Sequence, residues 1–433
     1  MKRGDSENRI YGKFDIVLLA AVIGLIAFGV LMVYSASSYN AEVNYGNEYY
    51  YMFKQIIGAV LGLAAMFACA FLDYHVLVKF RYVILGISYA LLILVFVPGV
   101  GVENYGAKRW INLPFFTIQA SEIAKFGFIV FTASYMAKNY KKMNTFKGLI
   151  PVLAVGATMC VLIILEPNMS ITMCVMLLMF AMLFIGGARM KHFAFLLIPV
   201  VALVPALIIL EPYRLDRLMA FLNPWESPLE EGYQLIQSFY ALGSGGLFGL
   251  GLFNSRQKYL FLPFSESDFI FSVIGEELGL FGCVMVIAAY MVIIYRAVRI
   301  AKNSNDRFGC YLSAGIAAII AIQTAINIAV VSGSIPPTGL PLPFVSAGTS
   351  SLIVFCAGIG VLLSVERFSH KSIKCLIGQQ YDGKSRGNKR VRQKINNVID
   401  KTVGNGGPAG KVSMPNHEID SAGPKQNTGQ HVA

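Results

Sequence analysis

Residues 261–282, FLPFSESDFIFSVIGEELGLFG, place four carboxylates in a stretch that otherwise has the composition of a membrane helix. They are Glu266, Asp268, Glu276 and Glu277. Moving an ionised side chain out of water costs free energy, so acidic residues are rare inside membrane spans and mark functional sites or buried polar networks there. This stretch therefore indicates a membrane-embedded fold and a place to look for its chemistry.

The rest of the sequence predicts an all-α polytopic membrane protein. Of its 433 residues, 56% are hydrophobic and 14% are charged, whereas about 25% of the residues in an average soluble domain are charged. A helix of roughly 20 apolar residues crosses a bilayer. Runs of similar length lie near residues 15–36, 52–72, 82–98, 120–137, 148–165, 169–186, 193–210, 269–294, 309–332 and 349–365. We therefore expect about ten transmembrane helices, with a large outer loop, residues 211–268, between the seventh and the eighth.

The basic residues predict the orientation, because cytoplasmic loops are enriched in Lys and Arg. With both termini in the cytoplasm, most of the 36 Lys and Arg fall inside, and the outer loops hold Lys108, Arg109, Arg214, Arg217, Arg256 and Lys258. We expect a cytoplasmic N-terminus over residues 1–13, a membrane domain over 14–366 and a disordered, basic cytoplasmic tail over 367–433. The net charge of +12 follows from this arrangement and does not indicate nucleic-acid binding.

The predicted outer loops contain few kinds of reactive group. No cysteine lies in them, and all five histidines fall on the inner side: His75, His192, His370, His417 and His431. This distribution argues against a His/Cys zinc site and against a histidine-based catalytic triad on the outer face. Carboxylates remain, which act as general bases when burial raises their pKa, together with Lys and Arg, which bind phosphate. These groups suit an anionic substrate linked to a lipid.

The four carboxylates differ in predicted depth. Asp268 lies where the eighth span meets the outer loop, so it either caps that helix or meets water and a lipid headgroup. Glu266 lies further out, and we expect it to be solvated. Glu276 and Glu277 lie about 12–14 Å deeper at 1.5 Å per residue, too far to act on the same atom as Asp268. For this pair we favour a buried polar network that joins spans.

Several motifs are specific when they occur together. They are GAKRWIN (106–112), QASEIAK (119–125), NPW (223–225), GYQLIQSFYALGSGGLFGLGLFNSRQKYLFLP (232–263), DFIFSVIGEELG (268–279) and PPTGLPLPFVSAGTSS (336–351). With these motifs, residues 14–367 resemble the SEDS family (shape, elongation, division and sporulation), which includes FtsW, RodA and SpoVE. The NPW motif and residues 243–258 are closer to the FtsW/SpoVE branch than to RodA.

The resemblance implies a function. Members of the family are peptidoglycan glycosyltransferases that polymerise lipid II on the outer face of the bacterial cytoplasmic membrane. They work with a class B penicillin-binding protein and with other membrane proteins of division or elongation. The catalytic aspartate of the family matches Asp268, which would activate the 4-hydroxyl of the acceptor sugar. That oxygen would attack the anomeric carbon of the donor with inversion, and undecaprenyl diphosphate would leave.

The remaining candidate residues receive substrate-binding or structural roles. Four cations are candidates for the diphosphate, of which Arg109 and Lys258 match family motifs and rank before Lys108 and Arg256. Glu122 and Lys125 either pair with each other at i, i+3 or act directly. Three residues bind sugar or peptide, or pack the loop: Gln234, Gln237 and Ser238. Two prolines are expected to fix the shape of their loop: Pro341 and Pro343. No metal ligand set follows from the sequence, and a divalent cation, Mg²⁺ or Mn²⁺, is left open as a cofactor.

The sequence also departs from the family pattern. Many relatives have His-Thr-Asp where this chain has Glu266-Ser267-Asp268, and Ser-Tyr-Gly-Gly where it has SAGT (346–349). They have Gln-Pro-Asp-Leu-Gly-Thr where it has EPNMSIT (166–172), so the usual aspartate is Asn168. A second acid at this place exists only if Glu166 takes that role.

Two other functions remain open at this point. A lipid II flippase would need a polar path between leaflets, and Glu276, Glu277 and Lys125 favour it. A non-enzymatic division scaffold would function without Asp268. The sequence does not distinguish a role in division from one in elongation or sporulation.

Overall fold

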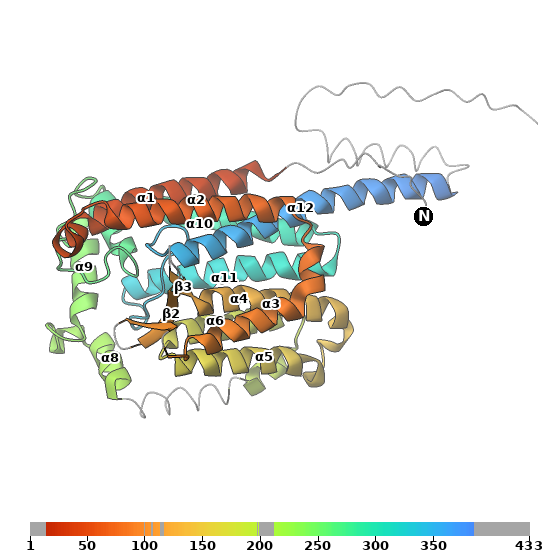
Figure 1. Ribbon diagram of the computed structural model, residues 1–433, viewed down its shortest axis with the longest axis horizontal. Helices are drawn as coiled ribbons and strands as arrows, with labels where there is room; N and C mark the ends of the chain where they lie inside the picture. The colour runs from red at the N-terminus through yellow and green to blue at the C-terminus, as the bar shows by residue number, and fades with distance from the viewer. Residues whose placement is uncertain are drawn as a thin grey trace, which may run out of the picture. The chain divides into compact units, whose positions relative to one another are not determined.

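The computed structural model describes residues 14–384, apart from 99, 105–106, 113–116, 197 and 199–211. The chain divides into two units, Met1–Cys375 and Leu376–Ala433, and the first contains the helical bundle (Figure 1). The helices are α1 (Ile16–Tyr45), α2 (Tyr50–Phe71), α3 (His75–Leu94), α4 (Ala120–Asn139), α5 (Phe146–Leu165), α6 (Met169–Ile185), α8 (Pro212–Leu222), α9 (Tyr233–Gly245), α10 (Ile270–Asn303), α11 (Arg307–Val331) and α12 (Thr349–Lys384), with short 3₁₀ helices η1 (Tyr140–Lys142) and η2 (Pro224–Glu226).

Helices occur at every predicted span that falls within the described residues. Seven of the described helices are long and apolar enough to cross a membrane, and α6 is a shorter apolar helix. The predicted span 4 is α4, which carries Glu122 and Lys125 in its interior. The predicted span 193–210 lies largely outside the described residues. The fold is therefore the helical, polytopic membrane fold that the composition predicts.

Two boundaries differ from the sequence prediction. The third span was expected at 82–98, but α3 begins at His75 and ends at Leu94. Its start was placed too late because the search for apolar runs excluded Lys79 and Arg81, which are part of the helix. Arg81 reaches Ser134 Oγ of α4 at 3.3 Å, so its charge is accommodated at the helix end. The tail was expected to be disordered from residue 367, whereas α12 continues to Lys384; no proline interrupts it there.

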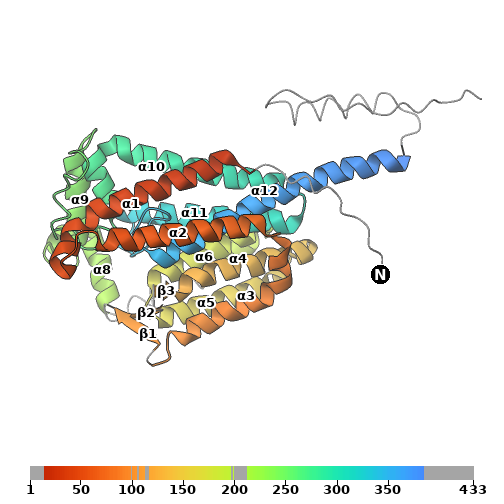
Figure 2. The same cartoon turned by 45° about the horizontal axis from the view of Figure 1, so that its top comes forward.

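The predicted loop before α4 contains a small antiparallel sheet that the all-α prediction did not include. Its strands are β1 (Gly101–Asn104), β2 (Ala107–Asn112) and β3 (Thr117–Gln119), in the order β1-β2-β3. Trp110 of β2 pairs with Gln119 of β3. The sheet leads directly into α4 and lies at one end of the bundle (Figure 2).

Helix α11 is the centre of the bundle. It packs against α10, α4 and α6, and α10 packs in turn against α1 and α9 (Figure 1). Of the most apolar part of α11, 61% is buried, compared with 11% in α3. A helix that is apolar all round suits this central position. Polar side chains on α11 therefore face other helices and not lipid.

Helix α10 is broken within its first half. Gly279 has φ 67° and ψ −164°, a conformation that favours glycine. The segment after α9 fills the break: the backbone N–H of Leu250 donates to Glu276 O at 2.9 Å, and that of Leu280 donates to Gly246 O at 2.9 Å. A Cβ on Gly279 would overlap the backbone nitrogen of Gly249. The glycine-rich stretch thus re-enters the helical layer, as its composition indicates.

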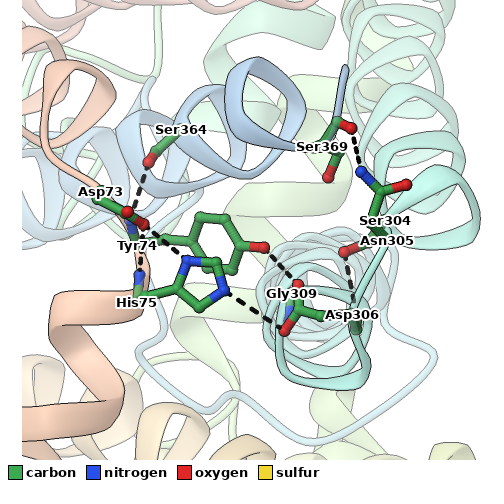
Figure 3. A network of polar contacts seen from close by, with 9 residues as sticks. All are labelled: Asp73, Tyr74, His75, Ser304, Asn305, Asp306, Gly309, Ser364 and Ser369. Atoms are coloured by element: carbon green, nitrogen blue, oxygen red, sulfur yellow. Dashed lines mark hydrogen bonds and ion pairs between the residues drawn. The ribbon is translucent and has the colours of Figure 1, made fainter. Parts of the chain in front are cut away.

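The end of the bundle opposite the sheet has a polar network of its own (Figure 3). Tyr74, in the turn before α3, donates its hydroxyl to Asp306 in the turn before α11. His75 Nδ1 lies 2.7 Å from Asp73 Oδ1, and its Nε2 lies 4.0 Å from Asp306 Oδ2. The backbone N–H of Tyr74 also donates to Ser364 Oγ of α12 at 3.1 Å. We call this group, with Asp306 at its centre, the Asp306 network.

Candidate functional site

Asp268 lies in the turn that leads into α10 and is half-buried. It is not the residue that caps the helix: Phe269 occupies that position, and no side chain caps it. The backbone carbonyl of Asp268 accepts a hydrogen bond from Asn327 Nδ2 at 2.8 Å. A Cβ built on Gly339 would lie 3.1 Å from Asp268 Oδ2, so the carboxyl group stands against the backbone of the proline-rich loop.

The proline-rich loop, residues 335–348, holds the turn that carries Asp268. Asn327 also donates to Leu340 O at 2.7 Å, so one amide joins both segments. Ser346 Oγ donates to Ser267 O at 2.6 Å and accepts from the N–H of Leu342 at 2.8 Å. The N–H of Ala347 donates to Glu266 O at 2.9 Å. Hydrogen bonds to the backbone carbonyls of Glu266, Ser267 and Asp268 therefore fasten this turn to the loop and to α11.

The two prolines that were expected to fix the loop shape, Pro341 and Pro343, both have backbone carbonyls that accept hydrogen bonds. Gln323 Nε2 donates to Pro341 O at 2.9 Å, and the buried Tyr290 donates its hydroxyl to Pro343 O. Gly339 and Phe344 have positive φ values of 69° and 67°. Anchored carbonyls and preset φ angles together give a loop with one shape.

Glu122 and Lys125 are paired, which is one of the two alternatives left by the sequence. Both side chains are fully buried, and Lys125 Nζ lies 2.8 Å from Glu122 Oε1. The ammonium also donates to Gln323 Oε1 at 2.6 Å, and Ser351 Oγ donates to Glu122 Oε2 at 3.3 Å. Through Gln323 this pair reaches Pro341 and hence the loop behind Asp268.

The sequence interpretation missed the two amides that connect these groups. Gln323 and Asn327 are four residues apart in α11 and therefore share one face of the helix. Both are buried. Their signal was available, because they are uncharged polar residues at helical spacing inside an otherwise apolar span, but nothing in the sequence said which segment they would contact.

Arg109 lies in β2 beside the turn between α5 and α6. Its Nε donates to Glu166 O at 3.4 Å, and its guanidinium also donates to Pro167 O. Glu166 is 1% exposed, and burial raises the pKa of its carboxyl to about 8, with the positive charge of Arg109 opposing the shift. Asn168 Oδ1 accepts from the N–H of Ile171 at 3.3 Å and caps α6. Lys108 also lies in β2, but its side chain is outside the described part of the structure.

Glu276 and Glu277 form the buried network that the sequence interpretation favours. Glu276 accepts from Ser255 Oγ at 2.5 Å and from the backbone N–H groups of Arg256 at 3.0 Å and Gln257 at 3.4 Å. Glu277 Oε1 accepts from Ser35 Oγ at 2.6 Å and from the N–H of Ser255 at 3.2 Å. The two carboxylates thus bind the segment after α9 to α10 and α1.

The two cations of this segment differ in exposure. Lys258 is 6% exposed, and its Nζ donates to Phe253 O at 2.5 Å within the same segment. Arg256 is exposed. In this conformation Lys258 stabilises its own segment through the contact with Phe253. Its role at the diphosphate stays a prediction.

The residues on α9 face in different directions. Ser238 is fully buried; its Oγ lies 2.8 Å from Ser272 Oγ and donates to Val331 O at 2.8 Å. It therefore packs α9 against α10 and α11, the second of its two predicted roles. Gln234 and Gln237 are half-buried, and their role as sugar or peptide ligands stays a prediction.

The expectation for Glu266 was wrong. We expected it to be solvated, but it is 7% exposed, and Ser265 Oγ donates to its Oε2 at 3.4 Å. Burial raises the pKa of the Glu266 carboxyl. The reason is tertiary: Ser265 also donates to Ala36 O at 3.2 Å, so α1 covers a segment that looks like an outer loop in the sequence.

Among the residues that the structure describes, no group of three or more His, Cys, Asp or Glu side chains is arranged to hold a metal ion. The divalent cation that the sequence leaves open is untested by this observation, because Mg²⁺ is commonly bound by one or two carboxylates together with substrate phosphates.

The arrangement defines a class of protein: a polytopic membrane protein with an acidic site at one end of its helical bundle, backed by a rigid loop and connected to a buried ion pair. The chain belongs to the FtsW/RodA/SpoVE family, described as "Cell cycle protein", whose family model matches residues 16–371. The resemblance stated from the motifs is thereby confirmed.

Relatives from this family align with this chain over most of their own length. Stage V sporulation protein E of Bacillus subtilis is 38% identical over 356 residues, which are 82% of this chain and 97% of the relative. A probable peptidoglycan glycosyltransferase FtsW of Geobacter metallireducens is 38% identical over 354 residues, 82% and 94% of the two chains.

Solved structures share the fold. A chain from a peptidoglycan synthase complex, studied for the coordination of polymerization and crosslinking, has a TM-score of 0.69 at 28% identity and covers 82% of this chain and 98% of its own. The rod shape determining protein RodA of Thermus thermophilus has a TM-score of 0.59 at 26% identity, with the same coverage.

Proposed function

We propose that this protein is a peptidoglycan glycosyltransferase that polymerises lipid II into glycan strands for cell division or cell shape. The observation that carries the proposal is the half-buried carboxyl of Asp268, held against Gly339 by the loop that Asn327 fastens. The name peptidoglycan glycosyltransferase is carried by a relative that matches 82% of this chain and 94% of its own length.

The proposed reaction needs one general base and a stable leaving group. Asp268 takes the proton of the 4-hydroxyl of the acceptor sugar as that oxygen attacks the anomeric carbon of the donor. The new glycosidic bond forms as the bond to the diphosphate breaks, with inversion. The electron pair leaves with undecaprenyl diphosphate, and the proton stays on Asp268 until water removes it. Because backbone contacts hold the Asp268 turn, the carboxyl is positioned before substrate binds.

In the proposed reaction, cations stabilise the diphosphate as negative charge develops on it. Arg109 is our first candidate, because its guanidinium is fastened to the α5–α6 turn by two backbone carbonyls. Lys258, Arg256 and Lys108 follow. A divalent cation supplied with the diphosphate stays a further proposal, tested by adding a chelator to the polymerisation assay.

We further propose that Asp268 faces the outside of the cell. Basic residues gather at the other end of the bundle, where the Asp306 network lies. Arg296, Arg299, Lys302 and Arg307 flank the α10–α11 turn, Lys138 lies in the last turn of α4, and Lys141 and Lys142 follow in η1. The positive-inside rule assigns that end to the cytoplasm. Lipid II and a class B penicillin-binding protein would then meet the protein on the Asp268 side.

The features that favoured a flippase have other partners in this structure. Lys125 is paired with Glu122, and Glu276 and Glu277 bind the segment after α9. These contacts weigh against a polar path that uses the same groups.

The test is polymerisation of lipid II by the purified full chain with its class B penicillin-binding protein. We expect glycan ladders from the wild type and none from a folded Asp268→Asn variant. Ladders from both proteins would remove Asp268 from the chemistry. If neither protein makes ladders while the partner binds, the chain is not a polymerase, and transport of lipid II into vesicles becomes the experiment for the flippase.

A further inference from the structure

The turn between α5 and α6 buries the carboxyl group of Glu166. The residue is 1% exposed, and neither Oε1 nor Oε2 has a hydrogen-bond partner among the residues that the structure describes. An ionised carboxylate in such a place is unfavourable, because it has lost its hydration without gaining a compensating contact. A purely structural residue would rarely be retained in this state, because an amide or an apolar side chain avoids the cost.

The one cation that acts on Glu166 among the described groups is Arg109. The guanidinium binds the backbone carbonyls of Glu166 and Pro167, so the turn fastens Arg109 whatever the charge of the carboxyl. Helix α6, which packs against α5, contains no charged residue between Met169 and Ile185. On α5 the nearest titratable group along the helix is Cys160, whose thiol donates to Thr172 O at 3.8 Å.

The local sequence places the acid at residue 166 and an amide at residue 168. Asn168 is fully used as the cap of α6, a role that Asn fills as well as Asp. Glu166 has no such structural use. Its carboxyl therefore differs from the other buried acids of this end: Glu122, Glu276 and Glu277 each accept at least one hydrogen bond.

We propose that Glu166 acts through Arg109 and, by its charge, controls how strongly Arg109 binds an anionic substrate. The neutral carboxyl does not compete for the guanidinium, whereas the ionised carboxylate competes with the substrate diphosphate for it. This inference rests on the proposed function, because it takes the diphosphate of a lipid-linked sugar as the ligand. It adds a residue that acts on substrate binding and not on the transfer step at Asp268.

The consequence is a pH dependence of substrate affinity with a definite sign. As pH rises through the pKa of Glu166, about 8, the ionised fraction grows and affinity falls. If the ionised form does not bind, the competent fraction falls about tenfold between roughly pH 7 and pH 9, and the apparent Kd rises by the same factor. The turnover rate at saturating substrate changes little, because Glu166 does not touch the reacting atoms.

The experiment measures two readouts on the full chain with its penicillin-binding partner. The first is KM and kcat for lipid II between pH 6.5 and 9.5 for the wild type and Glu166→Gln. Between pH 7 and pH 9 we expect KM to rise about tenfold in the wild type and to stay flat in the variant, with similar kcat. A wild-type KM that stays flat, or a rise that persists in Glu166→Gln, would overturn the proposal.

The second readout is binding of undecaprenyl diphosphate, which requires no turnover. Binding is measured for the single variant Asp268→Asn and for the double variant Asp268→Asn/Glu166→Gln. We expect the affinity of the single variant to fall as pH rises and that of the double variant to stay constant. This readout separates the two proposals. If the chain shows no polymerase activity but still binds the lipid diphosphate with this pH dependence, only the proposed polymerase activity is refuted.

Arg109→Lys is the matched control, because it keeps the positive charge and loses the planar guanidinium. We expect it to bind undecaprenyl diphosphate more weakly at pH 7. Unchanged binding would overturn the role given to Arg109.

Discussion

The two ends of the bundle each centre on an aspartate, but they use it differently. Asp306 accepts from Tyr74 and from the N–H of Gly309, and it faces His75, so its side chain is engaged by three residues (Figure 3). Asp268 is held through its backbone carbonyl by Asn327, and its carboxyl group stands against Gly339. The Asp306 side chain joins turns of the bundle, whereas the Asp268 turn is fastened to the proline-rich loop through its backbone.

The buried groups around the two aspartates do not themselves separate the two ends. Among the described residues, buried polar atoms without a hydrogen-bond partner occur at both: Asn327 Oδ1 and Thr338 Oγ1 near Asp268, and Ser369 Oγ beside the Asp306 network. At the Asp306 end, burial and the contact with Asp306 raise the pKa of Tyr74, which keeps its hydroxyl protonated as a donor. The contrast between the ends therefore rests on how each aspartate is held.

Replacing each aspartate by alanine is the most direct way to break this comparison. For Asp268→Ala we expect polymerisation to fall at least about a hundredfold, the lower range for a general base, with little change in thermal stability because the contact with Asn327 uses the backbone. For Asp306→Ala we expect the converse, a loss of about 1–2 kcal/mol from the α11 cap and the Tyr74 contact. Glycan ladders and thermal unfolding in detergent measure both. Equal effects of the two variants on activity would refute the assignment.

The buried ion pair gives the next largest effect. In Lys125→Met the carboxylate of Glu122 loses its cation while buried, which costs about 3–5 kcal/mol. The double variant Glu122→Gln/Lys125→Met removes both charges and should recover most of that loss. The unfolding temperatures of the three proteins test this. If the double variant is no more stable than Lys125→Met, the pair does not act as a unit.

Glu166 predicts a pH dependence of stability at the Asp268 end. Its pKa is raised from 4.5 to about 8 in the folded protein, so folding favours the neutral form. The associated stability is fully present below about pH 4.5 and is lost as pH rises toward 8. We expect the melting temperature of Glu166→Gln to fall less than that of the wild type between pH 5 and 8. Parallel melting curves across this range would contradict the assignment.

Tyr74→Phe sharpens the comparison with the smallest expected effect. It removes the hydroxyl that donates to Asp306 and keeps the buried ring. We expect a loss of about 1.5 kcal/mol, the low range for a hydrogen bond to a charged group, and unchanged polymerisation per folded molecule. Reduced kcat at full folding would show that the Asp306 end takes part in the reaction.

Much of the fold could be predicted because its signals are local. The apolar runs mark the helices, and glycine and proline mark the broken segment after α9 and the loop behind Asp268. The sheet from β1 to β3 escaped prediction because its strands are short. Glu266 was misplaced because its burial depends on α1, which lies far away in the sequence.

The candidate site was predictable in its residue types and not in its connections. Asp268, Arg109 and the pair Glu122–Lys125 stand out as charges in or beside apolar spans. The amides Gln323 and Asn327 are visible as polar residues in an apolar span, but the sequence does not say that they join Lys125, the loop and Asp268.

The sequence by itself determined that this chain is a polytopic membrane protein of the FtsW/RodA/SpoVE family, because the length of apolar runs and the motifs are properties of neighbouring residues. Only the tertiary structure decided which polar groups are satisfied and which are not. Glu276 and Glu277 accept hydrogen bonds from a segment that re-enters the helical layer, whereas the buried carboxyl of Glu166 accepts none from the described part of the chain. The physical reason is that burial and hydrogen bonding of a side chain depend on segments brought together from distant parts of the chain.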